Sequence, residues 1–413
     1  MFRSYLIVAF RGIARNKLNS ALNIIGLSLG ISCFILITIY TLNETSYNTH
    51  YTDSQQIFRV TMDLISKESG SVEQLAWSDA SLGPKLKEYP EVISTASIGK
   101  LSDNAVVKIA EKQFNELSIY KAEKTYFNIF NHHWLKGSTK SALENPGSVV
   151  LTESLALKYF GRSDALNQSI NIDHREYIVT GVIKDLPKNT DLIFDALVSL
   201  ETRVESSFEW CYLYLKLHDG TSAAEFQAKL DDLFAKEIRP VLDESNADGN
   251  YHLEPLLGIH FGIPKLFDTP KADEKNVWLF TFIGLLVLGM SCINYINLSI
   301  AESMRKNKDV GVRKVMGAIP GQIQFQYLTC SLLIAFVSIV FAVAISIFTI
   351  PILNNLINSN IQVENLMTFG FCGILLLVLF LVGIGAGGYP AFYLSSFNFI
   401  KALYGNGAPT KAK

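Results

Sequence analysis

The sequence predicts a membrane protein with four transmembrane α-helices and a large α+β domain between the first and second helices. The 413 residues are 49% hydrophobic, with a mean hydropathy of +0.24. This is too apolar for an ordinary soluble chain and too polar for one that lies wholly in the membrane. Four apolar runs contain no Asp, Glu, Lys, Arg or His, and they lie at about 21–42, 277–300, 327–353 and 366–388. A helix of roughly 20 residues crosses a hydrocarbon core about 30 Å thick, so each run is long enough to span a membrane.

Residues 1–20 predict a cytoplasmic amphipathic helix that lies on the membrane surface. Phe2, Leu6, Phe10 and Ile13 fall on one helical stripe, with basic residues on its flank. Such a helix buries its apolar face at the boundary of the headgroups and acyl chains. The alternative is that these residues are only the positively charged flank of the first span. The run at 21–42 is too long for a signal peptide and no A-x-A-like cleavage site follows it, so we interpret it as a retained span.

The polar stretch 43–275 predicts a mixed domain of helices and strands. Its clearest elements are a strand followed by a helix at 149–161, a hairpin at 170–187, a strand at 210–217 and an amphipathic helix at 222–238. Thr152 is a suitable N-cap for the first helix, because its hydroxyl can accept from an otherwise unpaired backbone N–H. The hairpin alternates apolar and polar residues and is expected to turn near Asp173 and His174.

The distribution of positive charge predicts the orientation. Basic residues precede the first span, follow the second and follow the fourth: Arg3, Arg11, Arg15, Lys17; Arg305, Lys306, Lys308, Arg313, Lys314; Lys401, Lys411, Lys413. The short loop 354–365 has none. Because basic loops are retained on the cytoplasmic side, 1–20, 301–326 and the tail 389–413 are expected in the cytoplasm. The domain at 43–275 and the loop 354–365 are then expected outside.

The loop 301–326 is the strongest candidate for a functional site. It carries five basic residues, yet it also predicts an ordered helix, because Val310, Val315 and Met316 can share one face and Gly317 offers an end. An ordered basic helix on a small cytoplasmic surface suggests a docking point for a cytoplasmic protein.

Glycines suggest two further features of the spans. Gly26 and Gly30 have the G-x3-G spacing that permits close helix packing, although glycine is frequent in membrane helices for other reasons. In the segment 383–396, glycines and Pro390 are expected to end the fourth helix.

Several kinds of chemistry find no support in the sequence. There is no G-x-x-x-x-G-K-[ST] loop for ATP and no H-E-x-x-H zinc motif. We interpret the adjacent His132 and His133 as structural, since few other ligands accompany them. No nucleophile-elbow sequence supports a catalytic triad. The uncharged spans argue against a proton or ion relay, and we predict no catalytic and no metal site.

The order of these parts resembles the MacB/FtsX-type ABC transporter permease family. The loop from Arg305 to Ala318 is similar to that family's coupling segment, with Asp309 where glutamate is usual. The stretch from 115 to 161, followed by YIVTGVIKDLP, resembles the family's periplasmic core domain. The start of the chain is similar to the family's first helices, and GYPAFYLSSF resembles members from Bacteroidota-type bacteria.

The resemblance implies a permease of the bacterial inner membrane with both termini in the cytoplasm. A cytoplasmic ABC ATPase would dock on the coupling loop, which comprises Arg305, Asp309, Gly311, Val312, Arg313, Lys314, Gly317 and Ala318. ATP and Mg would be bound by that ATPase, and this chain would bind no cofactor and have no intrinsic ATPase activity. ATP-driven closure would move the periplasmic domain, a mechanism called mechanotransmission, to export or extract a peptide, a toxic compound or a lipoprotein.

Other expected partners are a second permease unit, membrane lipid and a periplasmic adaptor or outer-membrane channel, but no nucleic acid. The ATPase would act as a dimer, so each of its two faces would need one coupling element. The second unit could be an identical chain, a homologous chain or a continuation of this one.

Two alternative functions remain open at this point. The chain could be a membrane-anchored scaffold or sensor whose periplasmic domain binds a partner such as a cell-wall hydrolase, without transport. It could also be an anchored external hydrolase, although no catalytic constellation supports that. The pattern of the coupling loop favours the permease, because a scaffold does not require such a loop.

Overall fold

The structure is a computed structural model that describes residues 7, 10, 11, 17–200, 210–305, 312, 316, 317, 319–357, 361, 363, 366 and 368–396. The chain divides into two compact units. One unit contains residues 1–43 and 275–413 and is called the helical bundle below. The other contains residues 44–274 and is called the sheet domain.

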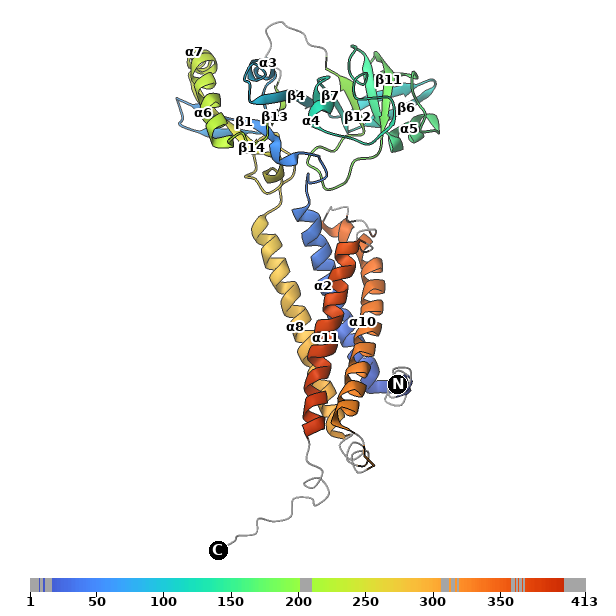
Figure 1. Ribbon diagram of the computed structural model, residues 1–413. Coiled ribbons are helices and arrows are strands. Elements are labelled where there is room, and N and C mark those ends of the chain that lie inside the picture. The colour runs from blue at the N-terminus through green and yellow to red at the C-terminus, as the bar shows by residue number, and fades with distance from the viewer. Residues whose placement is uncertain are drawn as a thin grey trace. The chain divides into compact units, whose positions relative to one another are not determined.

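The described part of the helical bundle is built from four long helices (Figure 1): α2 (Lys17–Thr45), α8 (Glu274–Arg305), α10 (Pro320–Ile357) and α11 (Phe369–Ser396). Within the described residues, three segments are long and apolar enough to cross a membrane: Lys17–Thr45, Glu274–Glu302 and Gly321–Leu356. α11 contributes a shorter apolar segment, Phe369–Gly385. These helices make the chain a membrane-embedded protein, and a fourth span at α11 stays a prediction.

The core of the bundle follows from the spacing of apolar residues on α2. Leu27, Ile31, Ile35 and Ile39 recur at every fourth position and are almost completely buried. Residues four apart lie on the same face of a helix, so these side chains form one continuous ridge. The ridge belongs to a cluster that includes buried residues of the other three helices, such as Tyr295, Ile339 and Val378.

The end of α11 differs from the sequence prediction. The helix does not stop at the glycines and Pro390 but continues to Ser396. Glycine lowers helix stability by only about 1 kcal/mol per residue, and proline is tolerated in membrane helices where neighbours satisfy the freed carbonyls. Close packing accounts for the glycine at position 383, because a Cβ there would lie 2.5 Å from Leu332 Cδ2 of α10. Gly383, the first glycine of the segment predicted to end the helix, is therefore a point of close contact between α11 and α10.

The sheet domain is organised around one mixed sheet. In its described residues the sheet has 14 strands, eleven of them in the order β14-β1-β13-β4-β7-β12-β9-β11-β10-β5-β6, while β2, β3 and β8 pair with β1, β13 and β11. Two pairs are parallel, β7 with β12 and β9 with β11, and the other pairs are antiparallel. The strand bounds are β1 Ile57–Ser66, β2 Val72–Leu75, β3 Ser78–Asp79, β4 Val92–Lys100, β5 Ala105–Ile109, β6 Lys112–Glu116, β7 Ile119–Ala122, β8 Trp134–Lys136, β9 Ser148–Thr152, β10 Ser169–Ile172, β11 Arg175–Ile183, β12 Ala196–Ser199, β13 Trp210–Leu217 and β14 Ala247–Pro255.

Short helices cover the sheet at both ends (Figure 1). Their bounds are η1 Ser54–Gln56, α3 Leu82–Leu86, α4 Tyr126–Ile129, α5 Glu153–Phe160, α6 Ala223–Leu233, the π-helical turn η2 Phe234–Ile238, α7 Arg239–Glu244 and η3 Leu256–Gly258. α6 and η2 bury Phe226, Leu230 and Phe234 against the end formed by β1, β13 and β14. At the other end α5 buries Leu155 and Tyr159 against β9 and β11.

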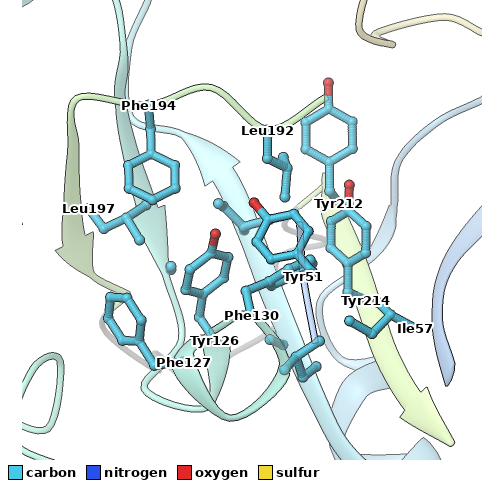
Figure 2. Close-up of a cluster of buried hydrophobic side chains, with 14 of the residues drawn as sticks. Tyr51, Ile57, Tyr126, Phe127, Phe130, Leu192, Phe194, Leu197, Tyr212 and Tyr214 are labelled. Atoms are coloured by element: carbon cyan, nitrogen blue, oxygen red, sulfur yellow. The ribbon is translucent and has the colours of Figure 1, made fainter. Parts of the chain in front are cut away.

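An aromatic cluster fills the middle of the sheet domain (Figure 2). Tyr51, Tyr126, Phe130 and Tyr214 are all at most 3% exposed. Phe130 contacts Tyr51 with ring centroids 4.9 Å apart and Tyr214 at 5.0 Å, both edge-on. Edge-to-face packing aligns the positive edge of one ring with the negative face of the next. The cluster therefore joins the segment after α2 to β13 and α4.

The local elements predicted for this domain are confirmed. β9 is followed directly by α5, and the Thr152 hydroxyl accepts from Leu155 N as its N-cap. β10 and β11 form the predicted hairpin, with positive φ at both Asp173 and His174. Such turns match the twist of paired strands. The predicted strand at 210–217 is β13. The predicted helix at 222–238 is α6 with its π-helical turn η2, capped by the Ser222 side chain.

Candidate functional site

The segment between α8 and α10 contains the predicted coupling loop. α8 ends at Arg305, and Val312 is helical. Met316 N donates to Val312 O at 3.1 Å, the i to i−4 bond of an α-helix. Gly317 follows with φ of +93°, a conformation that favours glycine. The bond and the φ of Gly317 agree with a helical end at that glycine. Val310 and Val315, which were predicted to share a face with Met316, lie outside the described residues, so the ordered helix and its role in docking stay predictions.

The other coupling residues are only partly placed. Arg305 is the last residue of α8. Val312 and Gly317 are described, and both are exposed. The remaining predicted residues, Asp309, Gly311, Arg313, Lys314 and Ala318, lie outside the described residues.

The described part of the loop exposes a group of apolar side chains. Val312, Met316 and Ile319 are 52%, 82% and 64% exposed. α10 begins with Pro320, and the Gln322 side chain accepts from Ile319 N at 3.4 Å, as in a helix-capping arrangement. This hydrogen bond fixes the backbone at Ile319, where the loop joins α10. Apolar side chains on a capped turn can contact a protein surface with little loss of conformational freedom.

The two glycines of α2 have different surroundings. A Cβ at Gly30 would lie 2.5 Å from Ser291 Cβ of α8, which is too close for any real side chain. A Cβ at Gly26 would lie 3.7 Å from Asn294 Nδ2, an ordinary contact. The close approach of α2 and α8 is thus at Gly30, within one chain. A role for either glycine in contacts to a second permease unit stays a prediction.

Hydroxyl contacts between helices were missed by the sequence reasoning. Ser32 Oγ of α2 lies 3.2 Å from Ser346 Oγ of α10, and both residues are buried. Thr41 Oγ1 of α2 lies 3.2 Å from Thr281 Oγ1 of α8. Small polar residues in apolar runs could have indicated such contacts, because membrane interfaces are enriched in them. The sequence does not reveal their partners, since the pairs are hundreds of residues apart.

Of the predicted amphipathic helix at 1–20, the structure describes residues 7, 10, 11 and 17–20, and the last four belong to α2. Ile7, Phe10 and Arg11 are helical, and Ile7 and Phe10 are exposed. Phe2, Leu6 and Ile13 lie outside the described residues. The surface role of this helix stays a prediction.

Two histidines of the sheet domain, His50 and His132, lie against aromatic rings. His132 Nε2 lies 3.3 Å from the Tyr126 hydroxyl, and its ring is nearly parallel to that of Tyr126. Burial lowers the pKa of His132 to about 3, and burial lowers that of His50 to about 4. In the described part of the chain no three His, Cys, Asp or Glu side chains gather in a way that could hold a metal ion.

Comparison with known proteins identifies the family. Residues 20–233 match the model of the MacB-like periplasmic core domain, and residues 280–399 match the FtsX-like permease C-terminal model. The first match alone covers more than half of the chain. This chain belongs to the MacB/FtsX-type permease family.

Individual relatives are distant. The chain is 22% identical over 362 residues to the macrolide export ATP-binding/permease protein MacB of Aggregatibacter actinomycetemcomitans, covering 83% of this chain and 53% of that protein. It is 21% identical over 413 residues to MacB of Bdellovibrio bacteriovorus, covering 95% and 60%. The chain thus spans about half to three-fifths of these relatives. The periplasmic region of MacB from Actinobacillus actinomycetemcomitans aligns at 15% identity and a TM-score of 0.33, covering 46% of this chain and 87% of that one.

Proposed function

We propose that this MacB/FtsX-type permease couples ATP hydrolysis by a separate cytoplasmic ATPase to movement of its sheet domain outside the membrane. The observation that carries the proposal is the loop between α8 and α10. It combines the family's coupling pattern with a helical turn, a glycine end and exposed apolar side chains. Basic residues would then pair with acidic or carbonyl groups of the ATPase, and the apolar residues would pack against it.

Export or extraction of a periplasmic or membrane substrate, such as a peptide, a toxic compound or a lipoprotein, would follow from that movement. The relatives named above are described as macrolide export proteins, which supports an export role. Both matched family models are permease and periplasmic domains, so ATP and Mg would be held by the partner. The purified chain alone is therefore expected to hydrolyse no ATP above background.

Positive charge supports the proposed orientation, with both termini and the coupling loop in the cytoplasm of a bacterial inner membrane. A second permease unit is expected, because a dimeric ATPase has two faces to engage. A periplasmic adaptor or an outer-membrane channel would be a further partner for substrates that leave the cell.

The docking proposal is tested by pull-down of the co-expressed ATPase in detergent. Arg313→Glu should weaken binding strongly, because it replaces charge-assisted hydrogen bonds with repulsion. Gly311→Trp should weaken binding by placing a bulky side chain in the docking surface. Arg11→Glu is the matched control, since it reverses a cytoplasmic charge outside the loop. Normal ATPase binding by both loop variants would contradict the proposal and favour the scaffold function.

The orientation is tested by labelling with an impermeant thiol reagent in intact spheroplasts, after removal of the native cysteines. A cysteine at Asn307 should stay unlabelled, whereas one at Asn358 should react. The reverse pattern would contradict the orientation.

A further inference from the structure

The sheet domain contains a hollow bordered by two short stretches of chain. One is Lys124 and Thr125 with the helix α4 that follows them, and the other is the segment 139–144 on the way from β8 to β9. The hollow encloses about 280 Å³. Pockets that bind small molecules begin at about 300 Å³, so this one suits a ligand with few heavy atoms.

The segment 139–144 is held firmly against the core of the sheet domain. Ala142 and Leu143 are at most 4% exposed and belong to the aromatic cluster. The Thr180 hydroxyl of β11 donates to the Ala142 carbonyl. Just before the segment, Gly137 has φ of +82°, and a Cβ there would lie 2.5 Å from Thr180 O. Because its backbone is anchored at both ends, this wall needs little ordering when a ligand binds.

The opposite wall is the short helix α4. Three of its four residues, Tyr126, Phe127 and Ile129, are buried, and only Asn128 is exposed. Asn128 N donates to Thr125 O at 2.9 Å, which holds the turn in place. The buried side of the helix thus fixes it in the domain, while Thr125 and Asn128 line the hollow.

The charged groups on the two walls leave an excess of positive charge. Lys124 Nζ lies 3.3 Å from Glu144 Oε1 of the opposite wall, and these side chains are 62% and 54% exposed. A pair this exposed contributes little to stability, so an anion can take the place of Glu144. Lys140 forms no ion pair or side-chain hydrogen bond with any residue that the structure describes. Two ammonium groups therefore border the hollow against one carboxylate.

Uncharged polar groups lie beside these lysines. Within the described ranges of the chain, the side chains of Asn128 and Thr139 also form no hydrogen bond. An amide side chain offers donors and an acceptor oxygen, and a hydroxyl can donate and accept. Leu143 adds an apolar contact. The lining therefore offers charge, hydrogen bonds and an apolar contact to one small molecule.

We propose that this hollow is a binding site for a small organic oxyanion, whose carboxylate or phosphate group lies between Lys124 and Lys140. Both kinds of group accept charge-assisted hydrogen bonds from ammonium ions, so the negative charge is the recognised feature. Asn128 and Thr139 bond to the uncharged polar atoms of the ligand, and Leu143 contacts its apolar part. The site lies wholly within the sheet domain and does not depend on ATPase docking.

Titration of the full chain in detergent micelles, followed by NMR of isotope-labelled leucine methyl groups, tests the site. The Leu143 signal is assigned from its loss in Leu143→Met. The probes are N-acetylalanine, methyl phosphate and the uncharged N-acetylalaninamide. At least one of the two anions should shift the Leu143 signal saturably, with a dissociation constant in the millimolar range, whereas the amide should not. The signal of Leu213, which packs in a separate cluster with Phe226, should stay constant.

Lysine variants separate this site from a general attraction of anions to the protein surface. Lys124→Met and Lys140→Met should each weaken binding about tenfold or more, because each removes one charge-assisted contact. Lys140→Arg keeps the charge and should retain most of the affinity. Lys108→Met is the matched control, because Lys108 is an exposed lysine of β5 outside the hollow. It should bind the anions as the wild type does.

The two anions identify the charged group of the ligand. A saturable shift with N-acetylalanine alone supports a carboxylate ligand, and one with methyl phosphate alone supports a phosphate ligand. No saturable shift with either anion would overturn the proposal. So would an equal response to the uncharged amide, or wild-type affinity in both Lys124→Met and Lys140→Met.

Discussion

The helical bundle and the sheet domain bury polar groups in opposite ways. The bundle contacts described above pair hydroxyl with hydroxyl, as at Ser32 and Ser346, or bring backbones together at Gly30. The sheet domain buries full charges, as at Arg59, Asp268 and Glu254. In lipid there is no hydrophobic force between helices, so close packing and weak hydrogen bonds hold them together. In water the burial of large apolar clusters offsets the cost of bringing a few charges inside.

The two regions are therefore vulnerable to different kinds of substitution. The bundle should respond to changes in side-chain volume and little to changes in charge. The sheet domain should respond strongly to loss of one charged partner.

Arg59→Met should lower the free energy of unfolding of the sheet domain by about 3–5 kcal/mol. The substitution leaves the Asp268 and Glu254 carboxylates without their shared cation, which is the costly way to break a buried pair. Thermal unfolding of the full chain in detergent, followed by tryptophan fluorescence, measures the effect, since Trp77, Trp134 and Trp210 lie in this domain. The control Lys67→Met breaks a surface pair and should cost about 1 kcal/mol or less. Equal losses in both variants would remove the distinction between buried and surface pairs.

Gly30→Ala should destabilise the bundle by about 1–3 kcal/mol, because the new methyl group overlaps Ser291 and forces α2 away from α8. Gly26→Ala is the matched control one turn away, where a Cβ meets only an ordinary contact. The control should be neutral or slightly stabilising, since alanine favours helix by about 1 kcal/mol. Unfolding in mixed detergent micelles, followed by circular dichroism, compares them. If Gly26→Ala is the more harmful change, the close approach has been placed at the wrong glycine.

Acid should weaken the sheet domain and leave the bundle unaffected. All seven histidines lie between residues 44 and 274. Burial lowers the pKa of His132 from 6.5 to about 3, so its neutral form contributes stability that is present above pH 6.5 and is lost as the pH falls toward 3. His132→Phe, which keeps an aromatic ring against Tyr126, should flatten the pH dependence of the unfolding temperature between pH 6.5 and 4. A wild-type slope in this variant would show that other groups control the acid response.

His260 should act with the opposite sign. Burial alone would lower the pKa of His260, but the nearby carboxylates of Asp191 and Glu44 raise it by more than burial lowers it. The net pKa of His260 is therefore raised above its usual value of 6.5. Its contribution to stability is therefore complete below pH 6.5 and is lost as the pH rises through the raised value. In a pH titration of thermal unfolding, His260→Gln should lose stability relative to the wild type at low pH and approach it at high pH. The reverse trend would contradict the ion pair with Glu44.

Ser32→Ala should have the smallest effect, about 0.6 kcal/mol, the average for a hydrogen bond between membrane helices. Ser32 Oγ meets Ser346 of another helix, whereas Ser28 Oγ donates to Ile24 O of its own helix. Ser28→Ala is therefore the control and should be close to neutral. Unfolding in mixed micelles resolves the two if enough repeats are made. A loss of several kcal/mol at Ser32 would mean that the bundle depends on polar contacts as the sheet domain does.

Local patterns explain what could be predicted from the sequence. The apolar runs indicated the long helices, because lipid excludes charge from about 20 successive residues. Thr152 as an N-cap and Asp173-His174 as a turn were predictable, since each acts on its own neighbours in the chain. The glycine end at Gly317 belongs to the same class. The wrong prediction for the end of α11 came from treating Gly383 as a local signal, when its role is a contact with Leu332.

Patterns along the chain were thus enough to predict the long apolar helices, the family and the short-range elements. The folded structure was needed to show which residues meet: β12 inserts between β7 and β9, Ser291 opposes Gly30, and Arg59 reaches Asp268 across 209 positions. An inward-facing arginine in the strand 57–66 signals that some carboxylate must be near, but not which one. The physical reason is that periodicity and capping act within a few residues of backbone, whereas a buried charge is stabilised by whatever partner the folded chain brings to it.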